Sequence, residues 1–167
     1  MRAGATATAI IGYASTGAGI ELPANQFDDY LRLYGLENIV KSRAGRGEQA
    51  KPGRERFFRY AKTLLTGQEP SQEVSRPLGL RYEIVPDVDP TRHGKPLASA
   101  LIVALLKGKP THLSARSDAQ GGFTLGLSQG GVWLIKSVHM VRASFFSSED
   151  WDSLWASLTF EVREPKP

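Results

Sequence analysis

No cysteine occurs among the 167 residues of this sequence. A disulfide framework, a thiolate metal site and a cysteine nucleophile are therefore excluded. Long apolar runs are scarce too: residues 1–11 contain one basic residue and no long hydrophobic stretch, so we expect neither a signal peptide nor a membrane anchor there. With 41% hydrophobic and 23% charged residues, the composition is that of a globular domain rather than of collagen or a coiled coil.

Several catalytic motifs are missing as well. The sequence has no Walker-type phosphate loop and no His-Glu-x-x-His helix. The glycines Gly17 and Gly19 form too short a pattern for a dinucleotide fingerprint. Asp87 and Asp89 are two residues apart, which fits a turn at least as well as an acid–base pair. We therefore expect a protein that is not an enzyme.

Charge is segregated along the chain. Between Lys41 and Lys62 lie eight basic residues against two acidic ones, whereas the stretch from Phe145 onwards carries five acidic residues against two basic ones. A uniformly cationic nucleic-acid-binding surface would not show this pattern, so a nucleic-acid partner is disfavoured. The basic residues of 54–62 would form either a solvated face or a surface for phosphate or an acidic partner.

The first half of the chain predicts one strand and three helices. Residues 6–13 alternate small polar and apolar side chains, which indicates a strand. Apolar residues then recur at helical spacing after Pro23 up to a stop at Gly35, and a second helix follows over residues 36–42. A third helix is expected to begin at Pro52 and to end at Gly67. Its apolar stripe would consist of Phe57, Tyr60, Ala61, Leu64 and Leu65.

The second half predicts a β-sandwich. A polar linker over residues 68–77 separates a helical N-terminal region, 1–77, from a β-rich C-terminal region, 78–167. The expected strands are 80–85, 99–106, 112–116, 123–127, 132–141 and 154–162. Short strands joined by turns, such as the one at 87–90, are typical of an antiparallel sandwich. Trp133, Ile135 and Ser137 should lie on one face of a strand and Leu134, Lys136 and Val138 on the other, with one of these two sets inward. The fold class is therefore mainly β, with two to three helices.

A family resemblance is carried by motifs along most of the chain. The most specific is the tryptophan-rich run Trp151-Asp152-Ser153-Leu154-Trp155, which continues to Glu161. The other motifs are 12–15, 21–24, 54–62, 78–80, 83–86, 94–97, 117–121, 131–136 and 138–140. Together they resemble a bacterial family of unknown function whose members are described as periplasmic components of nickel or cobalt uptake transporters.

This resemblance implies a transthyretin-like (prealbumin-like) sandwich, a place in the periplasm or cell envelope, and a membrane transporter component as partner. Members generally begin with a signal peptide and strands of a first sandwich, so the chain resembles a member truncated at its N-terminus. The resemblance also implies the deletion of one further strand, because only residues 87–93 separate the motifs 83–86 and 94–97, which a strand normally divides. The strand at 101–106 would then be left at an edge.

Histidine supplies the metal-ligand candidates. Nickel and cobalt ions favour imidazole nitrogen where thiolates are absent, and the sequence has three histidines. His139 lies on the best-defined strand, whereas His93 and His112 sit in or beside turns. We therefore expect His139 to be the metal ligand if any residue here binds metal. Met140 should point to the opposite face, since neighbours on a strand alternate. The alternative for His139 is a half-buried histidine bonded within the core.

The aromatic residues near the C-terminus allow two interpretations. Phe145, Phe146, Trp151 and Trp155 could form a stacking platform for a sugar, or they could pin one end of the sandwich to the helices. For the whole protein, the leading hypothesis is a non-enzymatic envelope binding protein, accessory to nickel or cobalt uptake. The rival is a structural or adhesive sandwich module that binds no metal.

Overall fold

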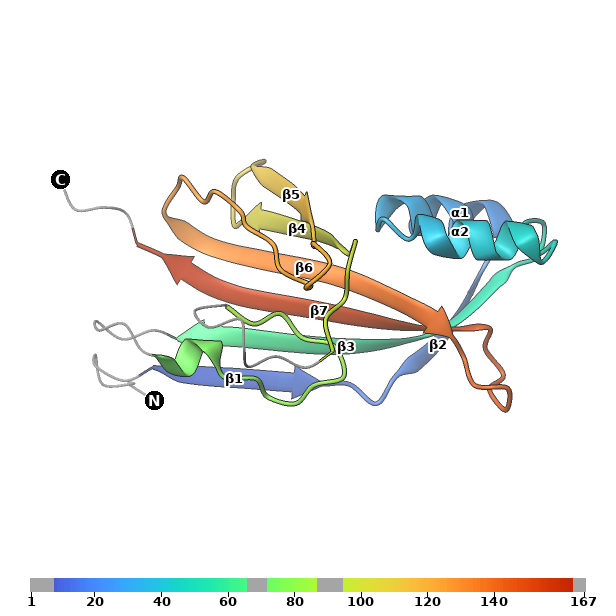
Figure 1. Ribbon diagram of the computed structural model, residues 1–167, viewed down its shortest axis with the longest axis horizontal. Coiled ribbons are helices and arrows are strands. Elements are labelled where there is room, and N and C mark those ends of the chain that lie inside the picture. Colours follow the sequence, from blue (N-terminus) through green and yellow to red (C-terminus); the bar gives the residue numbers. More distant parts are fainter. Residues whose placement is uncertain (1–7, 66–71, 87–94, 164–167) are drawn as a thin grey trace.

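Seven strands form one mixed β-sheet in the part of the chain that the computed structural model describes, residues 8–65, 72–86 and 95–163 (Figure 1). The strands are β1 (Ala9–Ala14), β2 (Ala18–Leu22), β3 (Gly53–Leu65), β4 (Leu101–Leu106), β5 (His112–Arg116), β6 (Gly131–Arg142) and β7 (Trp151–Val162). Their order is β1-β3-β7-β6-β4-β5, and β2 also pairs with β3. The fold is mainly β, as expected, and strands from both sides of residue 77 share the sheet.

The sheet departs from the expected antiparallel arrangement at its centre. β3 and β7 pair in parallel, with Phe57 opposite Ser153, while every other pair is antiparallel. The seven described strands lie in one sheet, so a second sheet facing it, as a transthyretin-like sandwich requires, does not occur among the described residues. Three predictions concern residues outside that part of the chain. They are the first part of the linker (68–71), the turn at 87–90 and the histidine His93.

The third expected helix is wrong, because residues 53–65 form the central strand β3. Tyr60 and Leu64 are four positions apart, a spacing that fits one face of a helix and one face of a strand equally well. The aromatic and β-branched residues here, among them Phe57, Phe58 and Thr63, favour a strand. Partners on both sides, β1 and β2 on one and β7 on the other, complete its backbone hydrogen bonds.

One face of the sheet is covered by coil rather than by a second sheet. The expected strands at 80–85 and 123–127 are wrong: both segments lack ladder pairing, yet their apolar side chains pack on this face. A short 3-10 helix, η1 (Gln72–Ser75), lies in the same layer. The buried residues of this first core are Leu64, Ile84, Ile102, Ala104, Leu106, Trp133, Ile135, Ala156 and Leu158. β4 pairs with both β5 and β6, so the expectation that 101–106 lies at an edge is also wrong.

The other face is covered at one end by two helices, α1 (Ala24–Leu33) and α2 (Glu37–Gly45), both of which the sequence predicts (Figure 1). Their buried residues form a second core with the ends of β6 and β7: Phe27, Leu31, Leu36, Ile39, Val138, Met140 and Trp151. Trp133, Ile135 and Ser137 are buried on the coil-covered face, which confirms the expected alternation. Strand β6 therefore buries opposite faces in its two halves.

Helix α1 sits directly on the start of β3. Gly53 is buried, and a Cβ at this position would overlap the ring of Phe27. Two residues further on, Glu55 is buried at 4% exposure beneath α1. Its Oε1 accepts hydrogen bonds from Tyr30, at 3.4 Å, and from Ser153, at 3.2 Å. The carboxyl of Glu55 thus lies at the junction between α1 and the sheet.

Candidate functional site

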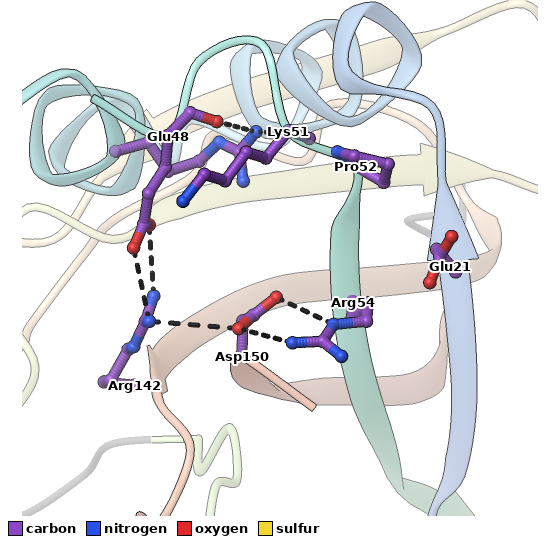
Figure 2. A pocket seen from close by; sticks show the side chains of 8 residues that line it. Glu21, Glu48, Lys51, Pro52, Arg54, Arg142 and Asp150 are labelled. Carbon is purple, nitrogen blue, oxygen red and sulfur yellow. Dashed lines mark hydrogen bonds and ion pairs between the residues drawn. The ribbon is translucent and has the colours of Figure 1, made fainter. Parts of the chain in front are cut away.

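A charged cleft of about 420 Å³ opens at the end of the molecule where the helices lie (Figure 2). It is lined by Glu21, Arg43, Glu48, Lys51, Pro52, Arg54, Arg142 and Asp150. These residues come from the end of β2, the C-terminal part of α2, the loop into β3, the start of β3, the end of β6 and the loop before β7. Widely separated segments therefore build the cleft together.

Arg43 shapes the wall of the cleft from inside the protein. Its side chain is buried, and its Nη2 donates hydrogen bonds to the backbone carbonyls of Glu48 at 2.9 Å and Lys51 at 2.7 Å. The guanidinium also lies 3.4 Å from Asp28 Oδ1 and over the ring of Phe27. A buried arginine that binds two carbonyls of one loop fixes that loop's backbone. The side chains of Glu48 and Lys51 are thereby held in place.

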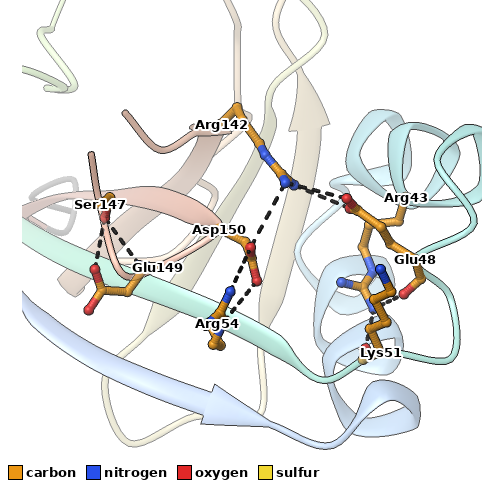
Figure 3. Close-up of polar contacts among 8 residues, drawn as sticks. All are labelled: Arg43, Glu48, Lys51, Arg54, Arg142, Ser147, Glu149 and Asp150. Carbon is orange, nitrogen blue, oxygen red and sulfur yellow. Dashed lines mark hydrogen bonds and ion pairs between the residues drawn. The ribbon is translucent and has the colours of Figure 1, made fainter. Parts of the chain in front are cut away.

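Ion pairs connect the remaining walls (Figure 3). Arg54 donates from Nε and Nη2 to the two carboxylate oxygens of Asp150, both at 3.2 Å. Arg142 bonds Glu48 through both terminal nitrogens, at 3.2 and 3.3 Å, and approaches Asp150 at 3.8 Å. Burial alone would raise the pKa of Asp150, but the hydrogen bond and charge of Arg54 lower that pKa below its ordinary value. Asp150 is therefore ionised in this network.

Two of the lining charges have no hydrogen-bonded or ion-paired partner in the part of the chain described: the ammonium of Lys51 and the carboxylate of Glu21. Four basic and three acidic side chains line the cleft, so its formal charge is +1. Arg142 in addition lies 4.9 Å above the ring of Trp151, which belongs to the second core. A movement of the Arg142 side chain would therefore alter the surroundings of the Trp151 ring.

The sequence analysis did not predict this cleft, although it identified the basic and acidic segments that supply some of its residues. The basic residues of 54–62, expected on a helix, lie on β3, where Arg54 pairs with Asp150, Arg56 with Asp152 and Lys62 with Glu83. The acidic stretch after Phe145 supplies two of these partners. The segregation of charge along the sequence was therefore the signal for the parallel contact between β3 and β7.

His139 lies on the coil-covered face of β6. Its ring is 5.9 Å from that of Tyr82, whose hydroxyl donates to Ser137 Oγ at 2.7 Å. Partial burial lowers the pKa of His139, so its imidazole is neutral at pH 7. Met140 is buried against the helices on the opposite face, as the alternation predicts.

The other possible metal ligands do not gather around His139. No group of three or more His, Cys, Asp or Glu side chains suited to a metal ion occurs among residues 8–65, 72–86 and 95–163. His112 is exposed on the edge strand β5. The structure therefore brings neither His112 nor a carboxylate cluster to His139, and its role as a ligand stays a prediction.

Trp151 and Trp155 pack against the helices. Trp151 is buried in the second core, and Trp155 stacks on Tyr30 with ring centroids 6.1 Å apart and contacts Tyr34 edge-on at 4.7 Å. Of the two interpretations, pinning the helices to the sheet is confirmed for these tryptophans.

A Gly-x-Ser-x-Gly pattern occurs at residues 126–130. In hydrolases this pattern is functional when a strand precedes the serine and a helix follows it. Here the segment is coil that leads into β6, and the carbonyl of Gln129 accepts a hydrogen bond from Trp133 Nε1 at 3.0 Å. Ser128 therefore lacks the strand–turn–helix setting of a nucleophile.

Comparison with known families gives one match: the model described as "Domain of unknown function (DUF4198)" covers residues 24–141, more than two thirds of the chain. The chain belongs to the DUF4198 family. No curated protein and no solved structure matches it. The DUF4198 match runs from α1 through most of β6, so it includes His139 and the cleft residues Arg43, Glu48, Lys51 and Arg54.

Three cleft residues, Glu21, Arg142 and Asp150, lie outside the DUF4198 match. The cleft is thus built partly from the shared domain and partly from the flanking strand β2 and the connection into β7. Within the described part of this DUF4198 chain, neither helix has the length and apolar character needed to cross a lipid bilayer.

Proposed function

We propose that this chain is a non-enzymatic binding module of the bacterial cell envelope whose charged cleft takes a small ligand bearing a carboxylate. The observation that carries the proposal is the unpaired ammonium of Lys51 in a cleft whose other exposed cations are engaged by carboxylates. An anionic group is the natural partner for that ammonium.

The size and charge of the cleft support the same ligand class. About 420 Å³ lies within the range of small-molecule sites. Three exposed basic side chains, Lys51, Arg54 and Arg142, line this cleft and can approach an anionic group.

Isothermal titration with acetate, succinate and glutamate tests this proposal. We expect binding of at least one of these probes to the full chain, and a loss of about tenfold or more in affinity in Lys51→Met, since one direct ionic contact is removed. Lys109→Met is the matched control, because Lys109 is exposed in the turn between β4 and β5. Tryptophan fluorescence gives a second signal, because Arg142 lies on Trp151.

The rival function, a structural or adhesive module, predicts a different outcome. In that case the ion pairs of the cleft only tie the loop after α2 to the connection before β7. This rival is supported if the full chain binds none of the three probes. It is also supported if the native protein and Lys51→Met bind a probe with equal affinity. Either result rejects the cleft as a ligand site.

A second candidate function is the binding of nickel or cobalt as an accessory to uptake of the ion. The family resemblance and the position of His139 on β6 support it. A neutral imidazole on a rigid strand is ready to donate its nitrogen lone pair to a metal ion. The partner in this proposal is a membrane transporter component, and the location is the periplasm or cell envelope. Further ligands would have to join His139, because a single imidazole does not complete a site.

Titration with nickel and cobalt chloride tests this second function. We expect His139→Ala to weaken binding at least about tenfold and His112→Ala, on the exposed edge strand, to leave it unchanged. Because burial lowers the pKa of His139, binding should persist to lower pH than it does for free imidazole. Unchanged affinity in His139→Ala removes this residue from the site, and loss of folding assigns it to the core.

A further inference from the structure

Two adjacent phenylalanines stand almost completely exposed in the connection between β6 and β7. Phe145 is 96% exposed and Phe146 94%, the highest values among the large hydrophobic residues of the described chain; the next is Leu33 at 71%. The connection projects from the sheet at the end where the helices lie (Figure 1). Isolated apolar residues are common on protein surfaces, but a pair of bare aromatic rings at a projecting tip calls for a partner.

The tip is an ordered turn. Ser147 N donates to Ser144 O at 2.9 Å, and at the base of the connection Ala143 N donates to Asp150 O at 3.0 Å. Ser147 Oγ in turn donates to Glu149 Oε2 at 2.8 Å. The two phenylalanine rings meet edge-on with centroids 5.7 Å apart. The backbone thus holds both rings outward and loses little conformational freedom when they are buried.

The exposed area is too small for a stable protein interface. Two phenylalanine side chains offer together about 300–500 Å², whereas each partner of a standard protein interface buries about 800 Å². Shallow insertion into a lipid bilayer needs no matching flat surface, because acyl chains close around a projecting group.

The charges near the tip fit a lipid surface. Residues 143–148 include no charged side chain, so the part that would enter the bilayer carries none. Behind them, Arg142 and Asp150 are ion-paired within the cleft, and Glu149 accepts a hydrogen bond from Ser147. A base with paired charges suits the headgroup layer and does not require anionic lipid.

We propose that Phe145 and Phe146 form a membrane-insertion tip that seats this end of the protein in the interfacial layer of a lipid bilayer. The bilayer contact is a peripheral one, made by two rings on a rigid turn. It orients the charged cleft toward the headgroup layer, because Arg142 and Asp150 flank the tip.

Co-sedimentation with vesicles tests the proposal. We expect the native chain to bind vesicles of phosphatidylcholine alone, to bind vesicles that also contain phosphatidylglycerol about as well, and to stay bound in high salt. In Phe145→Ser/Phe146→Ser the partition coefficient should fall by about tenfold or more, since nearly all of the inserted apolar area is removed. Leu33→Ser is the control, because Leu33 is also exposed but lies on α1.

A spectroscopic readout checks insertion directly. The fluorescence of Phe145→Trp should shift to the blue with vesicles and should be quenched by brominated lipid, whereas the native Trp133 and Trp151, which are buried, should not respond. Absence of binding by the native chain, or equal partition of the double serine variant, overturns the proposal. So does a native dimer that the double variant converts to monomer, which would place the rings between two copies.

Discussion

Arg56 and Asp152 lie directly opposite each other in the parallel pair β3–β7, and Arg56 Nη2 contacts both carboxylate oxygens of Asp152, at 3.1 and 3.2 Å. Asp152 is nearly buried, while Arg56 is more than one third exposed along its side chain. The pair therefore joins two interior strands of the sheet whose residues lie 96 positions apart in the sequence.

We expect a double-mutant cycle with Arg56→Met and Asp152→Asn to give a coupling energy of about 1–2 kcal/mol, because one partner is shielded from water. The exposed pair Arg116–Glu37, at 2.9 Å, is the control and should give about 0.5 kcal/mol or less. Urea denaturation measures both cycles. Equal coupling in the two pairs would mean that burial adds nothing to the Arg56–Asp152 contact.

Lys62 and Glu83 form an ion pair in which replacement of one partner should cost more stability than replacement of the other. The ammonium of Lys62 is buried 2.9 Å from Glu83, and its other neighbour is the carbonyl of Arg76 at 3.5 Å. Glu83 also accepts hydrogen bonds from the backbone of Leu78 and Gly79. Removing Glu83 therefore strands a buried charge, whereas removing Lys62 leaves Glu83 with two donors.

The expected costs follow this asymmetry. Glu83→Gln should lower the free energy of unfolding by about 3–5 kcal/mol, the cost of an unpaired buried charge, and Lys62→Met by about 1–2 kcal/mol. Chemical denaturation of the two variants decides the point. If Lys62→Met proves the more damaging, the backbone donors do not compensate Glu83.

Glu55 makes stability depend on pH. Desolvation raises its pKa, and the hydrogen bonds from Tyr30 and Ser153 only partly oppose this. Oε2 of Glu55 and Nε1 of Trp151 have no partner among the described residues. Since the folded state binds the proton more tightly than the unfolded state does, stability falls as the pH rises from the unfolded pKa, about 4.3, through the raised folded value.

Glu55→Gln should remove this pH dependence. We expect the variant to unfold with a free energy equal to that of the native protein near pH 4 and higher by about 1–3 kcal/mol at pH 8, where the native carboxylate is ionised. Thermal or urea unfolding across this range measures the difference. A constant difference at all pH values would show that Glu55 stays in one protonation state.

Gly53 is a packing requirement for α1. In Gly53→Ala the new methyl group meets the buried ring of Phe27, so the helix must move away from β3. We expect a loss of about 2–3 kcal/mol in the free energy of unfolding, typical of overpacking. Gly45→Ala is the control: it adds a methyl to α2 where no atom lies within 4 Å, and it should be neutral or stabilising by up to about 1 kcal/mol. Equal effects would mean that α1 adjusts freely.

Periodicity predicts elements well where one pattern is possible. Helix α1 has an apolar stripe that fits only a helix, and β6 alternates cleanly over Trp133, Ile135 and Ser137. β3 was misassigned because Tyr60 and Leu64 satisfy both periods. β2 was missed because Ala18 and Gly19 give it almost no side-chain pattern, and its place in the sheet comes from pairing with β3.

The candidate site was less accessible to sequence reasoning, for a topological reason. A local pattern reports which residues share a face, but it does not report which strands become neighbours. Glu48 and Arg142 meet only because the loop after α2 reaches the end of β6, and nothing near either residue encodes that contact. The alternation of His139 and Met140, a purely local property, was confirmed.

The parallel contact between β3 and β7 also determines when folding can finish. Arg56 and Asp152 are 96 positions apart, so the centre of the sheet closes a long loop, and such closure slows folding. On the ribosome, β3 emerges with β1 and β2 already available, whereas β7 is made last among the seven described strands. Until it arrives, β3 and β6 each expose an unpaired edge that can join another chain. A nascent chain that stalls before residue 151 is therefore prone to aggregate at these two edges, and the emergence of β7, which pairs with both, removes the hazard.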